Sequence, residues 1–435
     1  MRDHDGETGP GRRRFLGAGL AAGAALALAG CTPEREPATP AFDPADWESV
    51  RAQFPLRTDH AHFAAFVLAA HPDQVRRAIE RHRRGLDADT DAYLHEDRET
   101  PVLRAAASYL GTPESEIALT DSTTMGLGIL FGGLRLRPGQ DVVTTEHDFY
   151  ATHEGLRLLA ARTGAEVRRA RLYDDPAAAG VDEIVSRLRA AIRPATRVVA
   201  ITWVHSGTGV RLPVKEISGM IAEINSGRDT EDRALLCVDG VHGFGAVADR
   251  VGDLGCDFLA TGTHKWLFGP RGTGVLWGRA WDAVAPVIPS FTGDGIAAWI
   301  GGYPPAGNNA AMGTPGGYHS FEHRWALDEA FAFHGAIGRD RIAARTAELA
   351  TRLKQGLAGI PSLRLVTPAS PELSAGLVCC SIAGQNPGAV AARLREQHRI
   401  VAGVTPYSDA YLRFGTSIVT SPEDVDRAVK AVAAL

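Results

Sequence analysis

Short apolar runs alternate with helical segments along most of this chain, and this alternation constrains the fold more than any other feature. Each run reads as a buried strand that follows helical or turn-like sequence. The expected strands are 117–120, 141–145, 197–202 and 235–239, and helices are expected over 74–85 and 102–110. Strands joined through helices run parallel and are covered on both faces. We therefore predict an α/β domain with a mixed, mostly parallel sheet, whose ligands bind at the carboxyl ends of the strands.

A second pattern begins near Phe321 and predicts a smaller α+β domain. Ser421 is suited to cap the last helix. Helices are expected over 323–336, 339–357, 387–398 and 422–435, and strands over 364–366, 377–382, 400–402 and 411–415. The predicted boundaries are thus 76–320 for the large domain and 321–435 for the small domain. Residues 47–75 are expected to pack with the small domain or across the active site.

The first 31 residues have the features of an export signal. Arg12-Arg13-Arg14-Phe15-Leu16 matches the twin-arginine pattern R-R-x-F-L, and an apolar stretch over 16–30 follows it. That stretch is too short and too weakly hydrophobic for a transmembrane helix. Its end resembles a lipobox, so Cys31 is a candidate lipid anchor. A proline-containing tether over 32–46 is expected next, and we predict export by the twin-arginine route to an extracytoplasmic location.

Charge and cysteine usage exclude several classes of protein. The formal charge of 46 − 51 = −5 is too mild for a nucleic-acid-binding surface. The cysteines after the signal lie in apolar runs, where they act as small core residues, and their spacing suggests neither a disulfide framework nor a metal site. These are Cys237, Cys256, Cys379 and Cys380.

Lys265 lies in a glycine-rich segment, 261–274, a short way after Asp239 at the end of an expected strand. Either residue alone is typical of a surface charge or a turn. Together they are what pyridoxal 5′-phosphate (PLP) chemistry needs, because a lysine forms a Schiff base with the cofactor aldehyde and an aspartate keeps the pyridinium nitrogen protonated. We therefore predict a PLP site built on Lys265 and Asp239.

Hydroxyl groups at a helix start form the second expected part of this site. The segment Asp121-Ser122-Thr123-Thr124-Met125-Gly126 follows a strand and opens a helix. Such a helix start binds phosphate through hydroxyls and free backbone N–H groups. Ser122, Thr123 and Thr124 are therefore candidate phosphate ligands.

In the order and spacing of these motifs, the chain resembles the class V aminotransferase-fold PLP enzymes (fold type I). That group includes isopenicillin N epimerase-like proteins, cysteine desulfurases, kynureninases and several aminotransferases. The resemblance covers nearly everything after the tether. It implies an amino acid or amine as the substrate, and a homodimer as the active unit.

The resemblance also implies roles for further residues. It implies that His147, with Tyr150 as second choice, stacks on the cofactor ring, and that Arg413 binds the substrate α-carboxylate. Thr314 would reach the phosphate of the partner subunit. The remaining cofactor-binding candidates are His205 and Ser206, where many members carry Asn, His242 near the 3-oxygen or the Schiff base, and Thr263 and His264 near the phosphate.

The reaction is less constrained than the cofactor. Transamination is the expected outcome, and the alternatives are epimerisation, as in isopenicillin N epimerase-like proteins, or elimination by a C–S or β-elimination lyase. A cysteine desulfurase needs a mobile cysteine on the loop 403–410, which has none. A non-catalytic ligand-binding lipoprotein is the alternative from another class, and the presence of Lys265, Asp239 and Arg413 argues against it.

Overall fold

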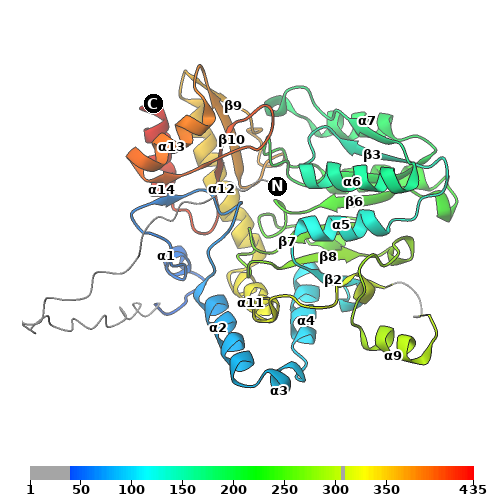
Figure 1. The fold of residues 1–435 in the computed structure, drawn as a ribbon. Coiled ribbons are helices and arrows are strands. Elements are labelled where there is room, and N and C mark those ends of the chain that lie inside the picture. Colours follow the sequence, from blue (N-terminus) through cyan, green and yellow to red (C-terminus); the bar gives the residue numbers. More distant parts are fainter. Residues whose placement is uncertain (1–39, 305–308) are drawn as a thin grey trace, which may run out of the picture. The chain divides into compact units, whose positions relative to one another are not determined.

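A seven-stranded sheet lies at the centre of the large domain (Figure 1). The computed structural model describes residues 40–304 and 309–435, so the expected signal over 1–31 and most of the expected tether lie outside it. Within the sheet only β8 runs against its neighbours, β7 and β2, and the prediction of a mixed, mostly parallel sheet is confirmed. The strand order is β2 (Ile117–Thr120), β8 (Gly274–Gly278), β7 (Phe258–Gly262), β6 (Leu235–Asp239), β5 (Thr196–Thr202), β3 (Asp141–Thr145) and β4 (Val167–Ala170).

Helices cover both faces of this sheet because its strands are apolar on both sides. Successive side chains of a strand point to opposite faces. Val142, Val198 and Cys237 therefore pack on one face with α5 (Thr123–Gly133) and α6 (Tyr150–Thr163). Their chain neighbours Val143, Val199 and Leu236 pack on the other face, with a second group of helices. This group includes α4 (Glu99–Leu110), α7 (Val181–Ala191), α8 (Val214–Asn225) and α11 (Leu327–Ile337).

The small domain has a four-stranded antiparallel sheet in the order β12-β13-β10-β9. Its strands are β9 (Leu363–Leu365), β10 (Leu377–Ile382), β12 (Gly403–Val404) and β13 (Leu412–Gly415). Its helices are α12 (Arg339–Ala358), α13 (Pro387–His398) and α14 (Pro422–Ala433). Ser421 caps α14 by accepting a hydrogen bond from the Asp424 N–H. The free cysteines Cys379 and Cys380 are buried in β10.

The N-terminal segment joins both domains. Its strand β1 (Ala61–His62) pairs in parallel with β11 (Ile400–Val401) of the small domain. Its helix α1 (Trp47–Ala52) contributes Val50 to a core shared with Phe268 of the large domain and Ile418 of the small domain. The helices α2 (Asp73–Ala88) and α3 (Thr90–Leu94) follow.

The structure differs from the expected domain boundary at Phe321. The helix expected over 323–336 is two helices, α10 (Phe321–Trp325) and α11, separated at Ala326. Both pack against α2 and α4 of the large domain. The change of domain therefore falls near Gly338, where φ is +93° and α12 begins.

The other described elements are short or lie at the periphery. They are α9 (Gly293–Gly301) and the 3-10 helices η1 (Glu114–Glu116), η2 (Pro176–Ala178), η3 (Thr230–Asp232), η4 (Val251–Asp253), η5 (Trp281–Ala283) and η6 (Ala310–Gly313). None of the helices in the described part combines the length and apolar character needed to cross a membrane.

Candidate active site

A cavity of about 150 Å³ lies at the carboxyl ends of β5 and β6, and it contains Lys265. We call it the Lys265 cavity. The large domain, the small domain and the N-terminal segment all contribute to its wall. The lining residues are Phe66, Val67, Phe149, Thr202, Ser206, Asp239, Val241, His242, Lys265, Pro406 and Arg413. Two larger hollows, of about 640 and 750 Å³, lie around Thr314 and α9, and neither contains Lys265 or Asp239.

Lys265 and Asp239 both line this cavity, Asp239 from a buried position and Lys265 from a partly buried one. Asp239 ends β6 and is 2% exposed, and its Oδ1 accepts a hydrogen bond from the Val241 N–H at 3.0 Å. Burial raises the pKa of Asp239 to about 6, while the Val241 N–H and Lys265 act in the opposite direction. Burial lowers the pKa of Lys265, and the nearby Asp239 partly opposes this effect. Such a lysine has a larger neutral fraction at physiological pH, which suits it to act as a nucleophile and base.

The loop that carries Lys265 is held in place by its neighbours. Phe268 has a φ of +56°, a conformation that costs a non-glycine residue energy. Its ring is buried against Phe54, 5.0 Å away between centroids, and this packing holds the conformation. The Ala69 N–H also donates to the His264 carbonyl oxygen at 3.1 Å. The N-terminal segment therefore fixes the loop from one side.

Arg413 enters the cavity from β13 of the small domain. Its Nη1 donates to the Ser206 carbonyl oxygen at 2.9 Å, and its guanidinium lies 4.2 Å from the centre of the Phe66 ring. Its Nε is buried without a hydrogen-bond partner. No carboxylate of the described residues forms an ion pair with Arg413, so a buried cation with free donors faces the cavity. A substrate carboxylate is the natural partner for such a group.

The sequence comparisons agree with this geometry. The model of the aminotransferase class V family matches residues 102–427. The chain belongs to that family. The family is PLP-dependent, which agrees with the lysine and aspartate in the cavity.

The relatives of this chain have names that refer to more than one reaction. The chain is 28% identical to isopenicillin N epimerase of Streptomyces clavuligerus, over 90% of this chain and 98% of that relative. It is also 28% identical to a probable cysteine desulfurase of Xylella fastidiosa, over 74% of this chain and 77% of that relative. Among solved structures, the complex of the cystine C–S lyase C-DES with cysteine persulfide has a TM-score of 0.77 at 20% identity, covering 88% of this chain and 99% of that one. This likeness confirms the expected fold, PLP fold type I.

The start of α5 offers the class V chain a place for a phosphate group. Ser122 is the N-cap, and its Oγ accepts from the Met125 N–H at 3.1 Å. Thr123 Oγ1 is buried without a hydrogen-bond partner, whereas Thr124 is exposed. A Cβ on Gly262 would lie 3.2 Å from Thr123 Oγ1 and 2.8 Å from His264 Cε1. Thr123 and His264 therefore lie close together beside Gly262. Because the Thr123 hydroxyl lacks a hydrogen-bond partner, it is available to bind a phosphate oxygen.

Thr263 is less suited to bind a phosphate. Its hydroxyl is buried and lies 2.5 Å from the Thr273 hydroxyl, which also donates to the Pro270 carbonyl oxygen. The Thr263 hydroxyl is thus engaged in hydrogen bonds within the loop that carries Lys265. His264 keeps one ring nitrogen available, because its Nδ1 lies 3.3 Å from the Thr273 carbonyl oxygen.

The expected ring-stacking residues, His147 and Tyr150, do not line the Lys265 cavity. The His147 ring stacks on Tyr173 with centroids 3.9 Å apart, and its Nε2 accepts from the Leu172 N–H. Tyr150 is 69% exposed. Phe149, at the N-cap of α6, lines the cavity. The pattern Glu-His-Asp-Phe-Tyr contains three aromatic residues. The one sequence signal that could have distinguished Phe149 is its position immediately before the helix.

Of the two residues that stand where many family members carry Asn, Ser206 lines the cavity and His205 does not. Burial lowers the pKa of His205 to about 3, and its Nδ1 is hydrogen-bonded to the Tyr173 hydroxyl at 2.8 Å. The Ser206 hydroxyl lies 2.6 Å from that of Tyr407, on the loop before β13. Thr202, which the sequence reasoning missed, has a buried Oγ1 without a partner at the end of β5. The cavity thus has an additional polar atom that a ligand can satisfy.

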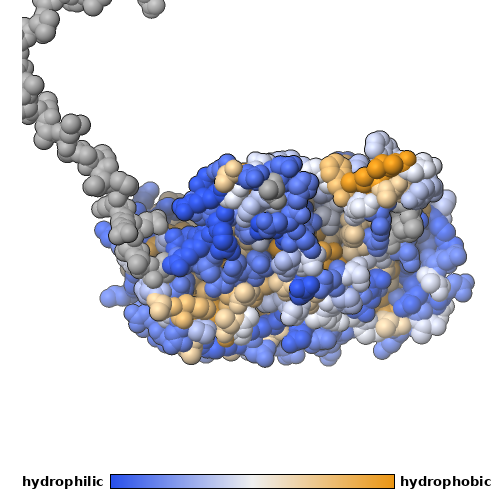
Figure 2. Space-filling model, turned by 90° about the horizontal axis from the view of Figure 1, so that it is seen from below, coloured by the Kyte–Doolittle hydropathy of each residue, from blue (hydrophilic) through white to orange (hydrophobic). Residues whose placement is uncertain are grey.

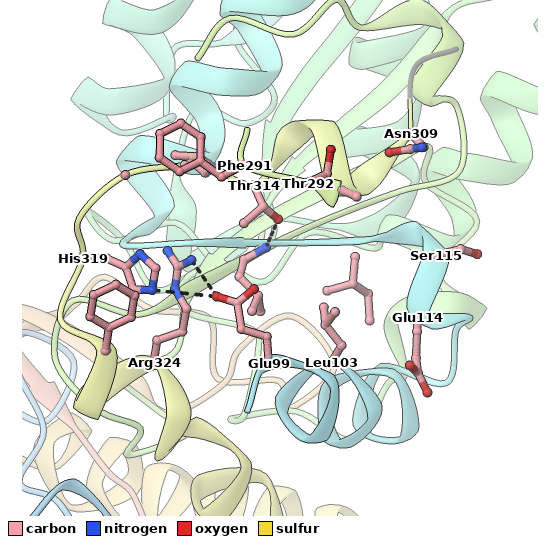
Figure 3. Close-up of a pocket in the computed structure, with 17 residues that line it drawn as sticks. Glu99, Leu103, Glu114, Ser115, Phe291, Thr292, Asn309, Thr314, His319 and Arg324 are labelled. Atoms are coloured by element: carbon pink, nitrogen blue, oxygen red, sulfur yellow. Dashed lines mark hydrogen bonds and ion pairs between the residues drawn. The ribbon is translucent and has the colours of Figure 1, made fainter. Parts of the chain in front are cut away.

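Thr314 does not reach the Lys265 cavity of its own chain. It lies in the hollow of about 640 Å³ shown in Figure 3, with Phe291, His319 and Arg324. Thr314 Oγ1 accepts from the Leu119 N–H at 3.0 Å, which leaves its hydroxyl hydrogen free to donate. Its expected role is therefore compatible with the structure only across a subunit contact.

Proposed function

We propose that this chain binds PLP at Lys265 and catalyses transamination of an α-amino acid. The observation that supports this most directly is the convergence on one cavity of Lys265 with two buried groups, Asp239 and Arg413, of which Arg413 has no carboxylate partner among the described residues. When bound, the cofactor supplies an electron sink for charge that develops at the substrate Cα. Thr123 and His264 would hold its phosphate, Asp239 its ring nitrogen and Phe149 one face of its ring.

The protein groups then have separate tasks. Arg413 orients the substrate by its carboxylate, and this grip determines which bond at Cα faces Lys265. The apolar side chains of Phe66, Phe149 and Pro406 keep water away from the reacting atoms. Lys265 would be the group that removes the proton at Cα and delivers it to another atom.

The number of bases in the cavity supports transamination. Its titratable lining groups are Asp239, His242, Lys265 and Arg413. Arg413 stays protonated, Asp239 is assigned to the ring nitrogen, and the Nδ1 of His242 accepts from Trp266 Nε1. Lys265 is therefore the one lining group left to act as a base. A single base on one side of Cα can remove the Cα proton and deliver it to another atom on the same side, which is the proton transfer that transamination needs.

Epimerisation is the second candidate, supported by the similarity to isopenicillin N epimerase over 98% of that relative. An epimerase must also deliver a proton to the opposite side of Cα. Desulfuration is not supported, because no cysteine of the described residues lines the cavity. Cys379 is fully buried in β10, where burial raises the pKa of its thiol to about 12. The Tyr407–Ser206 hydrogen bond holds the loop that would have to carry a mobile cysteine.

A panel of L-amino acids incubated with holoenzyme separates these reactions. Transamination converts the amino acid to its keto acid and requires an added keto acid for turnover. Epimerisation gives the D-amino acid without a keto acid, and lyase activity gives a keto acid and ammonia without an acceptor. D-amino acid as the main product, or acceptor-independent release of ammonia, would contradict the transaminase proposal.

Replacing Arg413 with Gln is expected to raise KM for the amino acid about 10- to 100-fold, the value of a charge-assisted hydrogen bond. Turnover of an amine that lacks the carboxylate should change little. Steady-state kinetics with the amino acid and the matching amine check this. Arg364→Gln, on the exposed edge strand β9, is the control. Equal losses for both substrates would remove Arg413 from carboxylate binding.

We further propose that two copies of the chain form the active unit. Next to Thr314 lies an exposed apolar surface, with Phe291 67% exposed and, on α9, Trp299 81% and Ile300 74% exposed. Figure 2 shows hydrophobic side chains gathered at the end of the molecule where α9 lies. Phe291 lines both the Thr314 hollow and the hollow beside α9. A second copy that covers this surface would bring a Thr314 hydroxyl to its partner's cofactor.

Mixing Lys265→Ala with Thr314→Val is expected to restore part of the activity that each variant lacks. Subunit exchange between two-fold dimers puts both defects in one site and neither in the other. Activity is measured after exchange has been shown by differential tagging. Exchange without recovery would place Thr314 in its own subunit's site or outside the site.

We also propose that the chain is exported by the twin-arginine route, since Arg12 and Arg13 match that signal. Replacing both arginines with Lys should leave the precursor in the cytoplasm, and Cys31→Ala should release any lipid anchoring. Fractionation of cells checks both results. Envelope localisation of the double variant would contradict this route.

A further inference from the structure

His242 is the one lining residue whose hydrogen bonding is set by the residue next to the reactive lysine. Trp266 Nε1 donates to His242 Nδ1 at 3.1 Å, and the two rings meet edge to face. An indole N–H is only a donor, so Nδ1 must be the acceptor. A neutral imidazole with an unprotonated Nδ1 carries its hydrogen on Nε2.

The surroundings of both residues hold this arrangement. His242 is 4% exposed and Trp266 is 2% exposed. Burial and the nearby positive charges of Lys265 and Arg413 keep the pKa of His242 well below its usual value, so the ring stays neutral. A Cβ on Gly376 would lie 2.6 Å from the Trp266 ring, so the small-domain backbone supports the indole directly.

The other ring nitrogen of His242 is free for a ligand. The residue lines the Lys265 cavity, and among the residues of 40–304 and 309–435 its side chain forms a hydrogen bond at Nδ1 and none at Nε2. Asp239, the carboxylate that also lines the cavity, accepts from the Val241 N–H. The Nε2–H group is therefore available to an oxygen atom of a bound molecule.

We propose that Trp266 is a positioning residue that fixes His242 as the Nε2–H tautomer, so that His242 donates a hydrogen bond into the cavity and does not act as a base. The assignment of Lys265 as the base is independent of this tautomer, but the count of one base in the proposed transamination rests on it. The tautomer can be measured without cofactor or substrate, so its failure is distinguishable from failure of the proposed reaction.

The first test is nitrogen NMR on cofactor-free protein labelled with ¹⁵N-histidine at neutral pH. His242→Gln identifies the His242 signals among the 15 histidines of the chain. We expect an unprotonated Nδ1 and a protonated Nε2 in the wild type, and a mixture of both tautomers in Trp266→Phe. A protonated Nδ1 in the wild type, or the same tautomer in both proteins, would overturn the proposal.

The second test uses holoenzyme and a double-mutant cycle. Trp266→Phe is expected to lower kcat about tenfold with little change in KM, the value of one hydrogen bond made in the transition state. A glutamine at position 242 donates through its amide whatever stands at position 266. Adding Trp266→Phe to His242→Gln should therefore lower kcat less than twofold. Equal effects in both backgrounds would show that Trp266 acts only through packing, and would overturn the proposal.

Discussion

Replacing Lys265 with Ala is expected to lower turnover by at least about 10³-fold, because the proposed function makes this side chain both the attachment point of the cofactor and the base at Cα. Bound PLP should also lose the visible absorbance of its link to the protein. Absorption spectra and product assays check both losses. In the wild type, borohydride reduction followed by peptide mapping should label Lys265.

The control for this variant is Lys430→Ala, on the exposed side of α14. It should leave both the spectrum and the rate unchanged. Labelling of a lysine other than Lys265, or turnover of Lys265→Ala within tenfold of the wild type, would contradict the assignment.

Replacing Asp239 with Asn is expected to reduce turnover by about 10²- to 10⁴-fold while the fold and cofactor binding remain. The neutral amide cannot hold a proton on the ring nitrogen, so charge that develops at Cα is less well stabilised. Single-turnover kinetics and a titration of bound cofactor check the two parts. Asp182→Asn, on an exposed turn of α7, is the control. Unchanged turnover would remove Asp239 from the mechanism.

The same variant makes a prediction about stability without cofactor. Burial raises the pKa of Asp239 from 3.8 to about 6, so folding favours the protonated carboxyl. That contribution is fully present below pH 4 and is lost as the pH rises through about 6. A difference of about 2 pKa units corresponds to about 3 kcal/mol. Cofactor-free Asp239→Asn should therefore unfold at a higher temperature than the wild type at pH 8 and at a similar temperature below pH 4.

Strands β2, β3 and β6 of the large sheet could be predicted from the sequence because their residues are buried on both faces. The runs 117–120, 141–145 and 235–239 coincide with β2, β3 and β6. The break between α10 and α11 could not be predicted, because Ala326 is a good helix former and the break is set by packing against α2 and α4. Local propensity carries no information about such a contact.

For the candidate site, whether a residue could be predicted to face the cavity depends on the element that carries it. Lys265, Asp239 and Arg413 converge because strand ends and the lysine loop fix their positions. His147 and Phe149 are two residues apart in a turn, and the turn decides which of them faces the cavity. That turn depends on buried hydrogen bonds from the Thr144 hydroxyl and the Thr145 N–H to Asp148, each 2.7 Å long, which the sequence does not reveal.

The N-terminal segment gives the cavity a property that concerns the order of folding. Ala61 pairs with Ile400, the Gly415 N–H donates to the Phe63 carbonyl oxygen, and Phe66 lies under the Arg413 guanidinium. Contacts between residues more than 300 positions apart carry a large entropic cost of loop closure, so they depend on folding of the chain between them. The cavity is therefore complete only when the first and last parts of the catalytic body have met. Retention of a ligand at Lys265 would accordingly report that these distant segments of the chain have come together.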